Sequence, residues 1–137
     1  MKRRGLAIVV LLFAVPFLVG MGVAPDGSPE KIPVPAKKFH ATFVDQADMI
    51  TDCHDVSIEG RVFLDGRRGE GLYTVAFDNI REVVFRQREG KLLALVRMQD
   101  GTAIELAPKK DHKAYGHTRW GTFQIKLGDL KKMILVR

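Results

Sequence analysis

Gly71-Leu-Tyr-Thr-Val-Ala-Phe-Asp-Asn-Ile-Arg-Glu-Val-Val-Phe85 has a close counterpart fifty residues later, in Gly121-Thr-Phe-Gln-Ile-Lys-Leu-Gly-Asp-Leu-Lys-Lys-Met-Ile-Leu135. The two stretches align without a gap, and the apolar positions coincide, so that Phe77 matches Leu127. Similarity at a fixed spacing identifies the supersecondary unit of which a fold is made. The chain is therefore expected to contain two copies of one unit.

Apolar and polar residues alternate around this repeat with the period of two that is typical of strands. The alternation is clear along 71–77, and no stretch of useful length has the period of a helix. We predict an all-β domain over residues 38–137. It is a small sandwich or barrel of about eight strands, built from two similar four-stranded units. The two pseudo-repeats are 38–87 and 91–137.

The chain must turn in the middle of each copy. A two-residue hairpin loop at Asp78 and Asn79 would place Glu82 on the buried face of the returning strand. A one-turn corner instead directs Ile80, and its counterpart Leu130, toward the interior. We therefore predict the corner.

Residues 1–24 are typical of a secretory signal peptide. A basic start at 2–4 precedes an apolar run that only Pro16 interrupts, and small residues follow. The alternative is an uncleaved membrane anchor over 6–24, which would be the chain's only contact with a membrane. Both interpretations predict an exported protein, periplasmic or extracellular.

Residues 25–37 are predicted to be a linker, because four prolines in this stretch favour extended backbone. The formal net charge of +6 falls to +3 without the basic residues at 2–4, which is too mild a charge to indicate nucleic acid. The charge is unevenly distributed: residues 25–87 carry −3 and residues 88–137 carry +6. Opposite charge on the two halves indicates a polar molecule or halves that attract each other, and the alternative is that the charges only form a solvated face.

The chain's single cysteine, Cys53, adjoins His54 within an acidic stretch, Asp45–Asp55. Its spacing fits no zinc motif, and neighbouring residues on a regular strand point to opposite faces. Nearby carboxylates would also raise the pKa of a thiol. We predict an acidic hairpin loop with Cys53 as a small buried hydrophobe, and expect no catalytic residue, metal or cofactor.

Pro108–Gly121 is the longest polar connection of the second half, and it corresponds to the glycine-rich turn Asp65–Gly71 of the first. Basic and aromatic residues together favour binding of an anionic or saccharide ligand, or of an envelope protein. The candidate binding residues are Lys109, Lys110, Tyr115, His117, Arg119 and Trp120. Alternatively, Tyr115 and Trp120 cap the mouth of a barrel while the lysines keep the surface soluble.

These observations predict an exported, non-catalytic β domain that acts as a binding or assembly module in the cell envelope. The alternative is a small exported enzyme or metal-binding protein that uses Cys53, His54 and the neighbouring acids. The sequence has no phosphate-binding loop, no nucleophile elbow and no zinc-binding helix motif.

Overall fold

The structure, a computed structural model, describes residues 32–136. The signal peptide predicted for 1–24 and most of the predicted linker lie outside the described residues. The described chain forms ten strands and two 3-10 helices. They are β1 (His40–Asp45), β2 (Ile50–Ile58), β3 (Phe63–Arg68), β4 (Gly71–Ala76), η2 (Phe77–Asn79), β5 (Ile80–Arg88), β6 (Lys91–Met98), β7 (Ala103–Leu106), β8 (Lys113–Thr118), β9 (Gly121–Lys126), η3 (Leu127–Asp129) and β10 (Leu130–Val136). Over this part of the chain, no helix is long and apolar enough to cross a membrane.

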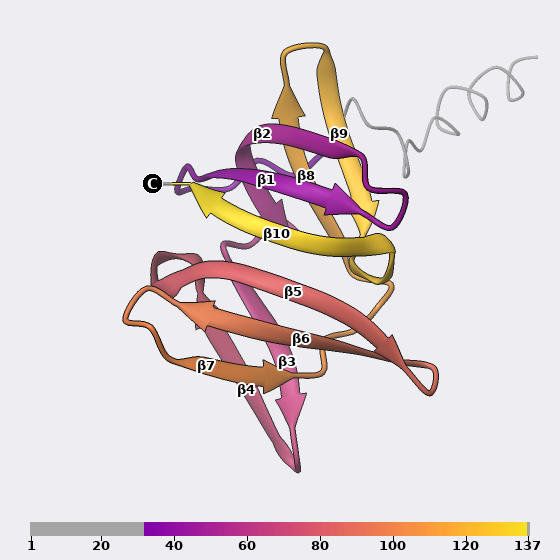
Figure 1. The fold of residues 1–137 in the computed structure, drawn as a ribbon. Helices are drawn as coiled ribbons and strands as arrows, with labels where there is room; N and C mark the ends of the chain where they lie inside the picture. The colour runs from indigo at the N-terminus through magenta and orange to yellow at the C-terminus, as the bar shows by residue number, and fades with distance from the viewer. Residues whose placement is uncertain (1–31, 137) are drawn as a thin grey trace, which may run out of the picture. The chain divides into compact units, whose positions relative to one another are not determined.

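Eight strands form one antiparallel sheet, in the order β7-β6-β5-β10-β1-β2-β8-β9, and β3 pairs with β4 in a separate hairpin (Figure 1). A backbone bridge between Arg67 and Ala107 joins β3 to the chain just after β7. The large sheet does not close on itself. The all-β prediction is confirmed, and the architecture is an open, sandwich-like one.

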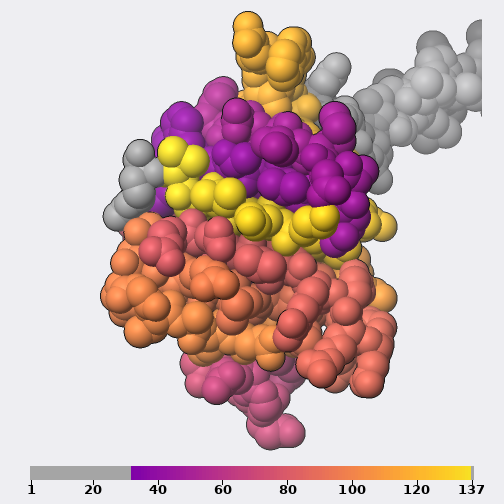
Figure 2. All heavy atoms as spheres, in the orientation of Figure 1, coloured from indigo at the N-terminus to yellow at the C-terminus, as the bar shows by residue number. Residues whose placement is uncertain are grey.

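The internal repeat is visible in the element bounds. β3, β4, η2 and β5 begin fifty residues before β8, β9, η3 and β10, and the β1–β2 hairpin corresponds to the β6–β7 hairpin. The two similar units interlock, because strands of one pair with strands of the other at β5–β10, β1–β10, β5–β6 and β2–β8. In the space-filling view, β10 lies between β1 and β5, while the β3–β4 and β8–β9 hairpins project at opposite ends (Figure 2).

Each unit has five strands instead of the four expected. The strand that the sequence hides is β8, which lies inside the connection predicted for Pro108–Gly121, and β3 likewise extends into the predicted turn Asp65–Gly71. The inward positions of β8 are Ala114 and Gly116, both buried. Residues this small leave no apolar alternation in the sequence, so the strand is not recognisable from the pattern.

The predicted corner is confirmed in both copies, because η2 and η3 each make one short turn between strands. Phe77 is 1% exposed and Leu127 is fully buried, and they begin the two turns. Ile80 and Leu130, which follow the turns, are also fully buried. All four belong to one hydrophobic core that both units build together.

Candidate functional site

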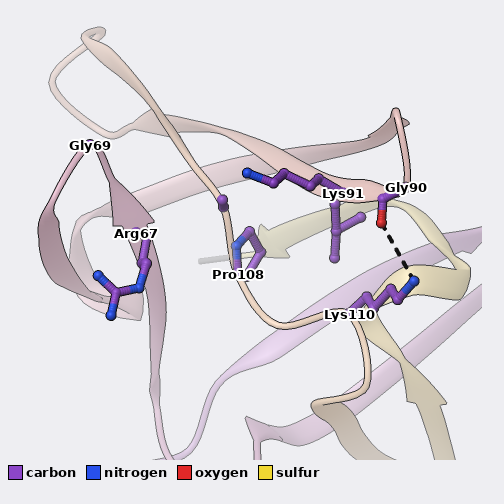
Figure 3. Close-up of a pocket in the computed structure, with 8 residues that line it drawn as sticks. Arg67, Gly69, Gly90, Lys91, Pro108 and Lys110 are labelled. Atoms are coloured by element: carbon purple, nitrogen blue, oxygen red, sulfur yellow. Dashed lines mark hydrogen bonds between the residues drawn. The ribbon is translucent and has the colours of Figure 1, made fainter.

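One groove on the surface is lined by positive charge. Its residues come from the β3–β4 turn, the β5–β6 turn and the chain after β7 (Figure 3). The lining of this basic groove is Arg67, Gly69, Gly90, Lys91, Leu92, Ala107, Pro108 and Lys110. Its volume is about 480 Å³. Three cationic side chains therefore share one hollow, and no aspartate or glutamate lines it.

The backbone of the basic groove is held by hydrogen bonds. The amide of Arg67 donates to the carbonyl of Ala107 at 3.0 Å, and the amide of Ala107 donates back at 2.8 Å. The Lys110 ammonium donates to the carbonyl of Gly90 at 3.5 Å, the contact drawn in Figure 3. Within residues 32–136, neither Arg67 nor Lys91 takes part in an ion pair. Both cations are thus available to an anion.

A second feature is a row of histidines across three neighbouring strands. His40 on β1 lies opposite His54 on β2, and His54 lies opposite His117 on β8. The rings of His40 and His54 are 6.0 Å apart between centroids, and those of His54 and His117 are 5.6 Å apart and nearly parallel. Register thus brings into contact two residues that the sequence analysis placed in separate stretches.

A β-bulge adds a carboxylate to this row. The register of β2 against β8 shifts between His54 and Ser57, so that Asp55 and Val56 together face one residue of β8. Asp55 has a φ of +53°, a left-handed conformation usual for glycine in bulges. One donor atom each from His54, Asp55 and His117 lie within 4.8 Å of one another. A bulge redirects side chains, so the rule that adjacent residues point apart fails here.

Cys53 takes no part in this cluster. It is buried in the core, and burial, followed by the charge of Asp52, raises the pKa of its thiol to about 12. A thiol with so high a pKa stays protonated at neutral pH and is a poor nucleophile or metal ligand. The high pKa therefore argues against a role for Cys53, together with His54, in catalysis or metal binding.

The six predicted binding residues lie in different places. Lys110 lines the basic groove, and Lys109 lines a neighbouring hollow with Arg61 and Asp65. Arg119 and Trp120 form the β8–β9 turn, at the other end of β8. Six strand residues span roughly 17 Å, so the lysines and the turn do not make one surface.

The two remaining candidates lie on β8 itself. His117 belongs to the histidine row, and Tyr115 pairs with Ser57 on β2. Tyr115 is partly buried, and burial, followed by the charge of Glu59, raises the pKa of its hydroxyl. The residues that sequence reasoning missed are Arg67 and Lys91 of the basic groove.

Two glycines show how closely the halves of the repeat correspond. A side chain on Gly66 of β3 would lie 2.7 Å from the Cβ of Leu106, and one on Gly116 of β8 would lie 2.7 Å from the Cβ of Cys53. Both glycines therefore let their strand approach a neighbouring strand at close range. Their alignment in the sequence was the signal from which this contact could be inferred.

The basic groove and the histidine row lie next to these equivalent contacts. Arg67 follows the first glycine and is bridged to Ala107, whereas His117 follows the second glycine and faces His54. Two equivalent contacts between the units thus carry a guanidinium in one case and a pair of imidazoles in the other.

A family model matches nearly the same part of the chain that the structure describes. A family model described as "Uncharacterised protein" matches residues 35–137, from just before β1 through β10. No curated protein and no solved structure matches the chain.

Proposed function

The chain belongs to the family whose model matches residues 35–137, and we propose that it is an exported, non-catalytic binding module that takes an anionic ligand of the cell envelope into its basic groove. The observation that carries this proposal is that Arg67, Lys91 and Lys110 all line one hollow that has no carboxylate in its lining. Export rests on the signal peptide predicted for 1–24.

The charges of the groove favour oxygen anions. A guanidinium presents a planar fork of donors that fits a phosphate or carboxylate with two parallel hydrogen bonds, whereas lysine acts as a mobile point charge. The backbone of Arg67 is fixed by its two bonds to Ala107, so only its side chain has to be ordered when it binds. Lys91 and Lys110 then add attraction from two other segments of the chain.

The size of the groove favours a ligand larger than a simple ion. Its volume of about 480 Å³ falls within the range of roughly 300–1,000 Å³ found for small-molecule sites. Gly69, Gly90 and Pro108 contribute backbone and small surfaces against which a sugar ring can pack. A saccharide that carries phosphate or carboxylate groups, a common component of envelopes, meets both requirements.

Titration followed by amide NMR tests this assignment, with trehalose 6-phosphate as the probe, trehalose as its neutral control, and inorganic phosphate to distinguish a free anion from a sugar. The expected result is saturable shifts at Gly69, Gly90 and Lys91 with the phosphorylated sugar and weak or no shifts with trehalose. Equal binding of trehalose and its phosphate would contradict the proposal.

Matched variants sharpen the test. Arg67→Ala combined with Lys91→Gln should weaken binding by at least about tenfold, since a charge-assisted contact contributes roughly 1.5–3 kcal/mol. Arg68→Ala is the control, because Arg68 is the next residue of β3, is exposed, and does not line the groove. A loss of binding in Arg68→Ala as large as in the double variant would place the ligand elsewhere.

A second candidate function, docking of an envelope protein, is favoured by the tip of the β8–β9 hairpin. Trp120 is 85% exposed there, and the guanidinium of Arg119 lies 5.3 Å from the centre of its ring. Tryptophan and arginine are the residues most often found as anchors in protein interfaces. This surface is separate from the basic groove, so one domain has room for both partners.

A further inference from the structure

We propose that His54, Asp55 and His117 form a binding site for a divalent first-row transition metal ion, with Zn²⁺ as the reference ion. Nothing in this proposal depends on the basic groove, because these three residues do not line it. The site lies on β2 and β8, where strand pairing sets the two histidines directly opposite each other.

The spacing of the donor atoms is close to that of a metal site. Donor atoms from the three side chains lie within 4.8 Å of one another. Around a tetrahedral zinc ion, with bonds of roughly 2.0–2.2 Å, ligand atoms are about 3.3 Å apart. The Nδ1 of the half-exposed His54 already lies 3.4 Å from the Asp55 carboxylate, and a small movement of its ring would bring the three donors to that separation.

The state of His117 indicates that a partner is needed. Its Nδ1 atom is buried and has no hydrogen-bond partner among the described residues. A buried polar nitrogen without a partner is unfavourable, and nearly all such atoms in folded proteins are satisfied. A metal ion held at that nitrogen would supply the missing partner.

The backbone of Asp55 adopts an unfavourable conformation that regular strand pairing does not require. Asp55 adopts a φ of +53° within the bulge, and such conformations in residues other than glycine concentrate at functional sites. At the equivalent contact, between β3 and the chain after β7, the pair is Arg67 and Ala107, followed by Pro108. The fold thus pairs these strands without histidine or a carboxylate, so the cluster is a property of this one site.

The donor set selects the class of ion. Two imidazoles and one carboxylate suit zinc, nickel and copper, whereas calcium and magnesium prefer oxygen ligands throughout. Three protein ligands leave one position of a tetrahedral ion open. His40 lies beside His54, with ring centroids 6.0 Å apart, but does not belong to the cluster of three donors. Lys38, 3.7 Å from the Asp55 carboxylate, is the cation that the metal displaces.

Isothermal titration calorimetry of the full-length protein with ZnCl₂, in a buffer that does not bind metal, is the primary experiment. Saturable binding of one ion is expected, and CaCl₂ should give no binding heat. His54→Ala and His117→Ala should each weaken Zn²⁺ binding by at least about 100-fold, the upper end of the loss seen when even an outer-shell partner is removed. His112→Ala is the matched control, since His112 lies outside the cluster.

A substitution at Asp55 separates metal binding from a structural role. Asp55→Gly removes the ligand and also relieves the left-handed backbone, so Zn²⁺ affinity should fall while the melting temperature of the metal-free protein stays level or rises. A residue kept only for structure would instead lower the melting temperature when replaced.

Imidazole ¹⁵N spectra provide a measurement on the unmodified protein: Zn²⁺ should shift the resonances of His54 and His117 and leave those of His112 unchanged. Absence of saturable Zn²⁺ binding to the wild-type protein would overturn the proposal. So would wild-type affinity in the combined His54→Ala, His117→Ala variant.

Discussion

His117 on β8 occupies the position in its unit that Arg67 occupies on β3. Each follows a buried glycine that packs closely on a neighbouring strand, and each lies opposite a residue just beyond that contact. The backbone around the two positions differs, because β8 pairs with β2 through the bulge at Asp55, whereas β3 meets the chain after β7 at one isolated bridge. The repeat thus carries the proposed anion site next to one of these positions and the proposed metal site at the other.

The equivalence of the two units is tested by their corners. Phe77→Ala and Leu127→Ala should each lower the free energy of unfolding by about 2–5 kcal/mol, because each removes a fully packed side chain from the shared core. Urea unfolding measures both losses. Ile50→Ala is the control and should have little effect, since Ile50 is exposed; a near-neutral result at Phe77 or Leu127 would contradict the common core.

The two close approaches are tested by adding a methyl group. Gly66→Ala and Gly116→Ala should each destabilise the protein by about 1–3 kcal/mol, because the new carbon would lie 2.7 Å from a neighbouring Cβ. Gly71→Ala is the control, since its nearest neighbour would be 3.7 Å away. Thermal melts of the three variants should rank Gly71→Ala as the most stable; equal melting temperatures would mean that the strands are not tightly packed at these points.

The buried thiol predicts a dependence of stability on pH. Cys53 has a folded-state pKa of about 12, above the ordinary value of 9.0. Below pH 9 the thiol is protonated in both states and contributes nothing to the pH dependence. Above pH 9 the unfolded chain loses this proton while the folded chain keeps it, so stability falls as pH rises toward 12.

Comparison with Cys53→Ala isolates this contribution from those of other groups that titrate in the same range. The loss of stability between pH 8 and pH 10 should be smaller in the variant than in the wild type. The native thiol should also resist alkylation at pH 8 and react once the protein is unfolded in urea. Rapid alkylation of the native protein would show that Cys53 is accessible.

The hairpin tip is tested through the fluorescence of Trp120, the single tryptophan of the chain. At 85% exposure its emission should be red-shifted and readily quenched by iodide in the free protein. Arg119→Ala with Trp120→Ala should leave urea stability unchanged and weaken capture of an envelope protein, increasingly so at low salt, where charge contributes most. Emission that is blue-shifted and resistant to quenching would show that Trp120 is buried, and would contradict docking of a partner at this hairpin tip.

Export is tested by mass. The predicted signal peptide implies a mature N-terminus between Met21 and Pro25, which intact-mass analysis of envelope fractions would detect. A full-length mass that remains with membranes after a salt wash would support the anchor over 6–24 instead.

Several features of the fold were determined by the sequence itself. The repeat and the alternation with period two predict two similar β units, because side-chain direction along a strand is a local property. The inward corners at Ile80 and Leu130 are equally local, but a register shift between Ile80 and Glu82, which the sequence analysis did not predict, turns Glu82 away from the buried face. The strand β8 was not predicted, because its inward residues, Ala114 and Gly116, are too small to produce an apolar alternation in the sequence.

Tertiary structure alone decided which residues form the candidate sites. Residues as distant in sequence as His54 and His117 meet through the pairing of β2 with β8, and register between distant strands is set by packing of the whole core. The bulge at Asp55 has an aspartate where glycine is usual, so no sequence pattern predicts the bulge. The basic groove is likewise assembled from three turns, and only the folded chain brings Arg67, Lys91 and Lys110 together.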